Sequence, residues 1–320
     1  MAEALEIDHW EASGLRVLVV RAPGGDRLAD RLDDVRALAD RHLNDCGAML
    51  LRGFGGLDAA GFGGFAAGFG RALLPYDFAS TPRRKIESGV YSSTEYPAHQ
   101  WIPQHNEQSY TRRWPMKIWF FCDVAPGEGG ATPISNSRAV HRRLDAAIRA
   151  RFDQRRLMYV RNYGRGLDLP WEAVFQTSDR AEVEDFCRLQ DIAWEWLDDG
   201  ALRTRQVCQS EMRHPVTGEA VWFNQAHLFH VSGLEPSLRE ALLDVVDEAD
   251  LPRNVVYADG APIEDAVLDE IRGVYRDATF TFPWVQGDVL LLDNMLTAHG
   301  RAPFSGPRRI LVAMAEAWRA

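Results

Sequence analysis

The strongest constraint on the fold of this chain comes from two polar segments that lie far apart in the sequence. Residues 101–110 read W-I-P-Q-H-N-E-Q-S-Y and contain His105 and Glu107. On an extended strand, residues i and i+2 point to the same face, so both side chains could reach one metal ion. His299 follows 194 positions after His105 (299 minus 105), where the apolar run L-L-L-D-N-M-L ends. If it completes the site, both segments must meet in one core, and we therefore predict a single domain over residues 1–320.

Two histidines and one carboxylate form the facial triad of non-haem Fe(II) enzymes, which leaves coordination positions open. Imidazole and carboxylate ligands also suit Mn(II), Co(II) and Zn(II), so the ligand set alone does not identify the metal. A lone H-x-E is weak evidence in a chain with nine histidines. The rival pair, His227 and His230, follows the strand-like V-W-F-N, and we interpret it as a pair of core or supporting histidines.

A cosubstrate site would decide among these metals. A dicarboxylic acid that chelates the ion at one end needs a cationic anchor at the other, and an arginine fork fits a carboxylate best. Arg308 and Arg309 follow the turn A-P-F-S-G-P after His299. We predict that one of them faces inward, and we assign Arg309 to the site. Thr132, after E-G-G-A, is predicted to add a hydroxyl donor.

Composition excludes several classes of protein. The net charge is −10, and the short basic runs favour solvated surfaces over a nucleic-acid site. Four widely spaced cysteines form neither a disulfide framework nor a zinc motif. The N-terminus lacks the pattern of a signal peptide, and no apolar run is long enough to span a membrane. We therefore expect a cytoplasmic protein with neither nucleic acid nor membrane as a partner.

The hydrophobic pattern predicts a mainly β protein with helical insertions. An α/β portion covers about residues 1–80, with a strand at 14–21 and helices at 27–44 and 58–69. Short strands broken by Gly and Pro then predict a sandwich or barrel core over about 85–135 and 205–320. A helical insert is expected between them, over about 137–200. An amphipathic helix is predicted at 236–249.

Several motifs together resemble the taurine dioxygenase-like family of Fe(II)/2-oxoglutarate-dependent oxygenases. They are H-N-E at 105–107, G-G-A-T at 129–132, D-N-M-L-T-A-H-G-R at 293–301 and P-R-R-I at 307–310. The segment R-H-P-V-T-G-E-A-V-W-F-N at 213–224 also fits this family. The resemblance covers roughly residues 45–320 in the family's order, and the combination is far more specific than any single motif.

This resemblance implies a double-stranded β-helix (jelly roll) core and the cofactors Fe(II), 2-oxoglutarate and O₂. It makes His105, Glu107 and His299 the iron ligands. It makes Thr132 and Arg309 the residues that hold the distal carboxylate of 2-oxoglutarate. Candidate substrate contacts are Gln104, Tyr110, Trp222 and Asn224, although strand alternation gives Gln104 a structural role by default.

Two departures from taurine dioxygenase itself carry information about the substrate. The acidic ligand is Glu107 rather than Asp, as in the clavaminate synthase-like branch, and P-Q-H-N-E-Q-S-Y resembles the syringomycin-type aspartyl hydroxylases of non-ribosomal peptide pathways. The arginine that grips the sulfonate is replaced by Ala313, which argues against alkylsulfonates. Halogenases lack the carboxylate, so Glu107 argues against halogenation.

The resemblance thus predicts hydroxylation of an unactivated C–H of an amino acid, either free or tethered to a peptidyl carrier protein, in secondary metabolism. Desaturation or cyclisation with the same cofactors stays open. So do a metal-dependent hydrolase or lyase and a non-catalytic jelly-roll module, both without 2-oxoglutarate.

Overall fold

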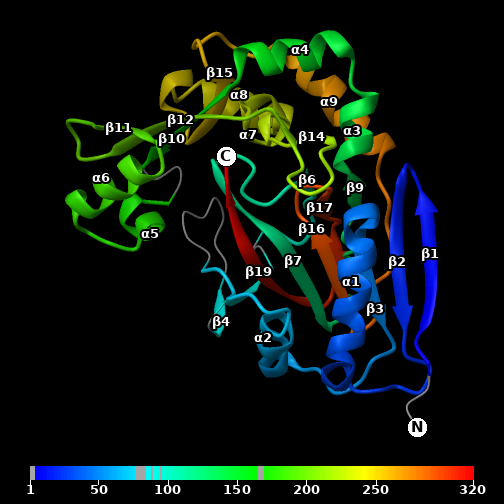
Figure 1. The fold of residues 1–320 in the computed structure, drawn as a ribbon. Helices are drawn as coiled ribbons and strands as arrows, with labels where there is room; N and C mark the ends of the chain where they lie inside the picture. The colour runs from blue at the N-terminus through cyan, green and yellow to red at the C-terminus, as the bar shows by residue number, and fades with distance from the viewer. Residues whose placement is uncertain (1–3, 76–83, 88, 94–95, 165–168) are drawn as a thin grey trace.

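An eight-stranded sheet forms the backbone of the molecule (Figure 1). The computed structural model describes residues 4–75, 84–87, 89–93, 96–164 and 169–320. The strands lie in the order β1 (Glu6–Ala12), β2 (Leu15–Arg21), β3 (Gly47–Arg52), β16 (Val289–Asp293), β7 (Arg113–Val124), β19 (Arg309–Arg319), β5 (Val90–Ser92) and β4 (Lys85–Glu87). Only the pairing of β2 with β3 is parallel among the described strand pairs of this sheet. The N-terminal portion therefore extends the main sheet.

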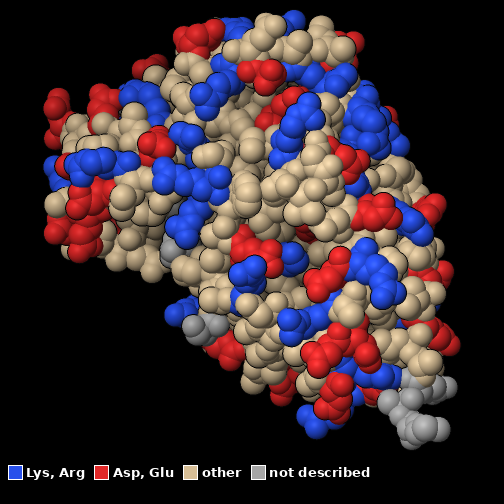
Figure 2. Space-filling model, in the orientation of Figure 1, with Lys and Arg blue, Asp and Glu red and all other residues tan. Residues whose placement is uncertain are grey.

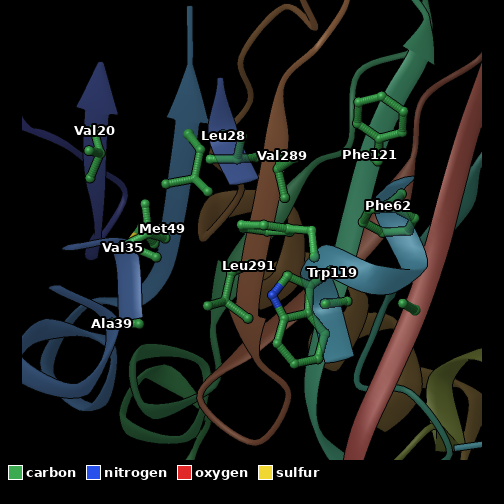
Figure 3. Packing of buried hydrophobic residues seen from close by; sticks show 14 of the residues in the cluster. Val20, Leu28, Val35, Ala39, Met49, Phe62, Trp119, Phe121, Val289 and Leu291 are labelled. Atoms are coloured by element: carbon green, nitrogen blue, oxygen red, sulfur yellow. The ribbon is translucent and has the colours of Figure 1, made fainter. Parts of the chain in front are cut away.

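The predicted helix at 27–44 is confirmed, and it explains the parallel pair. A 3₁₀ turn, η1 (Leu28–Arg31), leads into α1 (Leu32–Cys46), which buries Val35, Ala39 and Leu43 on one face. Gly47 ends the helix in the left-handed region, with φ at 78°, and starts β3 directly. The helix packs with α2 (Ala59–Ala67) on one face of the sheet, where Trp119, Phe121 and Leu291 point into the same cluster (Figure 3).

A smaller sheet faces the other side of the main sheet. It contains β6 (Ile102–His105), β17 (Thr297–Arg301) and β9 (Ile134–Asn136), in that order. Apolar side chains from β7, β19, β16 and β9 form one buried cluster between the sheets. A separate two-stranded ribbon pairs β8 (Glu128–Gly129) with β18 (Phe304–Ser305). Segments from both ends of the sequence thus meet in one core.

The insert is not purely helical, which corrects the prediction for 137–200. It has helices α3 (Ser137–Arg143), α4 (Ala146–Arg155), α5 (Trp171–Phe175) and α6 (Arg180–Leu189). It also builds an antiparallel sheet in the order β11 (Ala193–Trp196), β12 (Leu202–Cys208), β10 (Leu157–Tyr163) and β15 (Arg253–Tyr257). Buried and half-buried side chains alternate along β12, which is the pattern of a half-buried strand.

The remaining elements complete a mixed fold with more strand than helix. They are β13 (Glu211–Arg213), β14 (Ala220–Trp222), α7 (Ala226–Phe229), η2 (Val231–Gly233), α8 (Pro236–Leu243), η3 (Glu248–Asp250) and α9 (Asp265–Asp277). The predicted helix at 236–249 is shorter than expected, and α8 buries no residue. Among the described residues, no helix has the length and apolar character to cross a membrane.

Candidate metal centre

Three of the predicted site residues come together in the structure. One ligand atom from each of His105, Glu107 and His299 lies within 4.8 Å of the others. His299 in β17 stands directly opposite His105 in β6, and their ring centroids are 4.7 Å apart. The distance from His299 Nε2 to Glu107 Oε2 is 3.8 Å. Such a spacing suits a cation between the groups, since buried imidazole and carboxylate need a partner.

Neighbouring groups fix the orientation of both imidazole rings. Nδ1 of His105 lies 2.8 Å from the carbonyl oxygen of Pro103. In the tautomer that donates Nδ1–H to this carbonyl, Nε2 has a lone pair free for a metal. The ring of Phe120, from the main sheet, packs against His299 with centroids 4.9 Å apart. The strand pairing and these contacts hold the two histidines in place before any ion binds.

Asn294 holds the turn that carries Glu107, a role that the sequence did not reveal. Its Oδ1 accepts a hydrogen bond from the Glu107 backbone N–H at 2.7 Å. Its Nδ2 donates to the carbonyl oxygens of Glu107 and Pro115, at 2.9 and 2.8 Å. The side chain is fully buried. It therefore ties the Glu107 turn to the β16–β17 connection that leads to His299.

The neighbouring Asp293 organises that connection itself. Its Oδ1 accepts from the backbone N–H groups of Met295 and Leu296, both at 3.0 Å. Its Oδ2 lies 3.1 Å from Nε2 of the buried His214. This contact gives a structural reason for H-P-V-T-G at 214–218 and for D-N-M at 293–295. Both segments belong to the motifs that resemble the family.

A cleft with about 400 Å³ of space opens beside the metal ligands. Its walls include His105, His299, Thr132, Phe120, Ile310 and Val312. Thr132 is therefore located where the sequence predicted it. The indole Nε1–H of Trp284 donates to Thr132 Oγ1 at 3.0 Å. The threonine hydroxyl can then donate its own hydrogen to an acceptor in the cleft.

Arg301 and Arg308 line this cleft and Arg309 does not, so the prediction of Arg309 is wrong. The Arg301 guanidinium is bound to backbone carbonyl oxygens, which leaves Arg308 as the candidate anchor. The Arg309 side chain is 59% exposed and forms an ion pair with Asp123 outside the cleft. The register between β19 and β7 shifts at Arg309/Ile310. Alternation from Ile310 and Val312, which line the cleft, leads back to Arg308. Counting from the family motif did not show which of the two adjacent arginines faces inward.

Arg308 has the properties of an anion anchor. Its Nε donates to the carbonyl of Gly130 at 3.0 Å, and one terminal nitrogen lies 3.4 Å from Ser93 Oγ. Burial, with repulsion from Arg301, lowers the pKa of the guanidinium to about 10. Among the described residues, no carboxylate pairs with it. A half-buried guanidinium of this kind gains a partner when a carboxylate enters the cleft.

The four predicted substrate contacts lie elsewhere, and the structure corrects them. Trp222 and Tyr110 belong to a buried apolar cluster, and Asn224 hydrogen bonds to Ser210 and Ala226. Gln104 donates to Ser135 and Thr279. None of the four is among the described residues that line the cleft. Gln104 and Tyr110 lie near metal ligands in the sequence, and Trp222 and Asn224 lie in a family segment, but neither position shows which way a side chain points.

His227 supports the site without reaching the metal, as the sequence indicated. The side chain is 2% exposed, and its Nε2 lies 3.0 Å from the carbonyl oxygen of Gln104. Its ring stacks on Tyr275. Burial lowers the pKa of His227 to about 3, so the ring is neutral at pH 7. A neutral ring that donates to Gln104 holds β6 from outside the metal centre.

Comparison with known proteins identifies the family. The model of the family described as "Taurine catabolism dioxygenase TauD, TfdA family" matches residues 17–314. The chain belongs to this family. It is therefore an Fe(II)- and 2-oxoglutarate-dependent dioxygenase, and the three buried ligands are its candidate iron site. This membership removes the hydrolase, lyase and non-catalytic alternatives.

Two relatives match most of the chain. The dapdiamide synthesis protein DdaC of Enterobacter agglomerans is 42% identical over 275 residues, which cover 86% of this chain and 84% of the relative. The clavaminate synthase-like protein At3g21360 of Arabidopsis thaliana is 30% identical over 286 residues, covering 86% and 83%. The second match agrees with the clavaminate synthase-like character of Glu107.

Solved structures share the fold at low sequence identity. PvcB from Pseudomonas aeruginosa superimposes with a TM-score of 0.56 at 17% identity, covering 98% of this chain and 94% of PvcB. AAD-2, solved with Mn(II) and N-oxalylglycine, gives a TM-score of 0.56 at 13% identity, covering 98% and 97%. These matches support the fold over the length of the chain.

Proposed function

We propose that this dioxygenase hydroxylates an unactivated C–H bond of an amino-acid-like substrate, free or tethered to a carrier protein. His105, Glu107 and His299 hold Fe(II) in this proposal, and Arg308 with Thr132 holds the distal carboxylate of 2-oxoglutarate. One observation carries the assignment. A half-buried arginine, Arg308, without a carboxylate partner among the described residues shares a cleft with two of the three candidate ligands.

The chain's own residues supply positioning and proton placement. His105 donates its Nδ1–H to the carbonyl oxygen of Pro103, which leaves the lone pair of Nε2 for the metal. Thr132 accepts from Trp284 and directs its hydroxyl hydrogen towards the cosubstrate. Phe120 and Ile310 exclude water beside the ligands. Bound Fe(II) and 2-oxoglutarate supply the activation of O₂, with release of succinate and CO₂.

Several features favour an amino-acid-like substrate over a sulfonate. With Arg308 as the anchor, the position four residues later is Val312 rather than Ala313, and this apolar side chain lines the cleft. A sulfonate would find no cation there. The match to a dapdiamide synthesis protein supports a role in secondary metabolism. Glu107 occupies the position that chloride needs, which favours hydroxylation over halogenation. Desaturation and cyclisation stay open as alternatives, because they begin with the same hydrogen abstraction as hydroxylation.

The two facing sheets also support a jelly-roll assignment. We propose that the sheet of β6, β17 and β9 and the facing part of the main sheet form the two halves of a double-stranded β-helix. The metal ligands then lie on the smaller half, at the open end of one domain that spans residues 1–320. Pairing of β6 with β17, nearly two hundred residues apart, supports this single domain.

Anaerobic titration tests the function. Protein with Fe(II) and 2-oxoglutarate should show a weak visible charge-transfer band, and O₂ should then yield succinate. Glu107→Ala should abolish O₂-dependent succinate formation because it removes an iron ligand. Folded wild-type protein without the band would refute the cosubstrate assignment. Full activity of the Glu107 variant would show that another carboxylate binds iron.

A further inference from the structure

A second arginine, Arg301, lines the metal cleft together with Arg308. It lies in β17, two residues after the ligand His299, and it is 6% exposed. Of the described residues that line this cleft, Arg301 and Arg308 are the only ones of the types Lys, Arg, Asp and Glu. The walls described here therefore carry two positive charges, and the nearby carboxylate of Glu107 is assigned to the metal.

Among the described residues, the Arg301 guanidinium hydrogen bonds only to backbone carbonyl oxygens. Its terminal nitrogens donate to the carbonyls of Tyr96, Pro97 and Gln100, at 2.9, 2.6 and 3.1 Å. Its Nε is buried and has no hydrogen-bond partner in the described part of the chain. Neutral carbonyls fix the orientation of the guanidinium, but they do not cancel its positive charge.

Many basic side chains elsewhere in the molecule have acidic neighbours. Figure 2 shows Lys and Arg interspersed with Asp and Glu on the visible face. Arg52, for example, pairs with Asp288, and Arg138 pairs with Glu219, each at 2.7 Å. The two cleft arginines have no such carboxylate among the described residues. Their charges are therefore available to an anion that enters the cleft.

One aromatic ring lies next to both cleft arginines. The guanidinium carbons of Arg301 and Arg308 are 5.2 and 5.4 Å from the centroid of the Phe304 ring. Burial lowers the pKa of Arg308 to about 10, and repulsion from Arg301 adds to this effect. The charge of Arg301 therefore acts at the position where Arg308 would hold a carboxylate. Charges act over such distances inside a protein because little water screens them.

We infer that Arg301 is a specificity-determining residue for the cosubstrate, because its charge favours 2-oxo acids that carry a second carboxylate over those that do not. The inference rests on the proposed function, in which Arg308 and Thr132 hold the distal carboxylate of 2-oxoglutarate. The hydrogen bonds of Arg301 to carbonyl oxygens keep it from binding that carboxylate directly. It acts through its charge, and loss of this charge should weaken 2-oxoglutarate binding by about 10-fold.

Anaerobic titration of the charge-transfer band tests this role with two acids. Both 2-oxoglutarate and 2-oxopentanoate chelate Fe(II) through a 2-oxo acid group, but only the first has a distal carboxylate. Arg301→Gln should raise the dissociation constant of 2-oxoglutarate about 10-fold and that of 2-oxopentanoate by less than about 2-fold. Arg301→Lys keeps the charge and should retain most of the wild-type ratio of the two constants. An equal rise for both acids in Arg301→Gln would overturn the inference, because Arg301 would then only hold the segment 96–100.

Arg138→Gln is the matched control for the loss of a buried arginine. Arg138 also donates to backbone carbonyls, those of Asn44 and Asp45, and it does not line the cleft. This variant should lose stability in urea unfolding but keep both dissociation constants. If Arg301→Gln does not fold, a folded Arg301→Lys without the wild-type ratio would overturn the inference.

The wild-type protein separates this inference from the proposed function. Absence of the band with 2-oxoglutarate in folded wild-type protein would refute the proposed function and the inference with it. A normal wild-type band, together with an unchanged ratio of the two constants in Arg301→Gln, would refute only the inference.

Discussion

At the scale of single residues, the clearest contrast lies between Arg308 and Arg309. Arg308 lines the cleft beside Thr132, whereas Arg309 is exposed and pairs with Asp123. We predict that Arg308→Gln raises the dissociation constant for 2-oxoglutarate by about 10- to 100-fold, the value of one or two charge-assisted bonds. Arg309→Gln should bind it like wild type. Anaerobic titration of the charge-transfer band measures both constants, and the reverse order would restore Arg309 as the anchor.

Because His227 is buried, we predict that the free energy of unfolding falls at acidic pH. Its pKa is lowered to about 3 in the folded protein, against about 6.5 in an unfolded chain. The unfolded state therefore binds more protons between these values, and the free energy of unfolding falls as pH decreases from 6.5 towards 3. Lowering the pH from 7 to 5.5 should cost roughly 1 kcal/mol through this group.

Urea unfolding at pH 7 and at pH 5.5 measures this loss of stability. His227→Gln keeps a donor for the Gln104 carbonyl but does not titrate. The difference in unfolding free energy between pH 7 and 5.5 should therefore be about 1 kcal/mol smaller in this variant. Identical differences in both proteins would show that His227 is not the titrating group.

At the scale of elements, the sequence predicted the two segments that carry the ligands, but not the local structure at Glu107. The i, i+2 pattern predicted one strand face for His105 and Glu107, whereas β6 ends at His105 and Glu107 lies in the turn that follows. The two facing strands are now seen to be direct neighbours. The sequence did not predict which side chains at the start of β19 face inward. A register shift at Arg309/Ile310, after a Gly/Pro turn, changes which of the two arginines points into the cleft. The four predicted substrate contacts pack or hydrogen bond inside the protein instead, and these long-range contacts follow no local sequence pattern.

The turn of Glu107 depends on one side chain from another element. Asn294 makes three buried hydrogen bonds to the backbone around Glu107 and Pro115. Asn294→Ala should destabilise the protein by about 3 kcal/mol, because it leaves buried groups without partners. It should also weaken Fe(II) binding at least about 10-fold, as loss of supporting bonds does at metal sites.

Asn162 offers a matched control for this loss. It donates to the carbonyls of Ala249 and Leu251 and accepts from Arg203, within the insert sheet. Asn162→Ala should cost similar stability yet leave Fe(II) affinity unchanged. Isothermal titration with Fe(II) under anaerobic conditions and urea unfolding give the two quantities. Equal loss of metal affinity in both variants would attribute the effect to general destabilisation.

At the scale of the whole molecule, the metal ligands join segments from distant parts of the chain into one core. His105 and His299 lie on paired strands, and the main sheet contains strands from both ends of the sequence. A ligand that binds only the folded state stabilises everything that unfolds with its site. In a single domain, Fe(II) and 2-oxoglutarate should therefore shift the entire thermal transition. At 100 times the dissociation constant the gain is about 2.7 kcal/mol.

Anaerobic calorimetry with and without both ligands measures this shift. We expect one transition, raised by roughly 5–11 °C, because the gain is about 2.7 kcal/mol and each kcal/mol raises the midpoint of a large domain by about 2–4 °C. His299→Ala should remove the shift while Arg309→Gln preserves it, because only His299 is a metal ligand in the proposed site. Two transitions of which only one moves would show that the insert or the N-terminal portion unfolds separately. The prediction of one domain over residues 1–320 would then be wrong, although the metal site would stand.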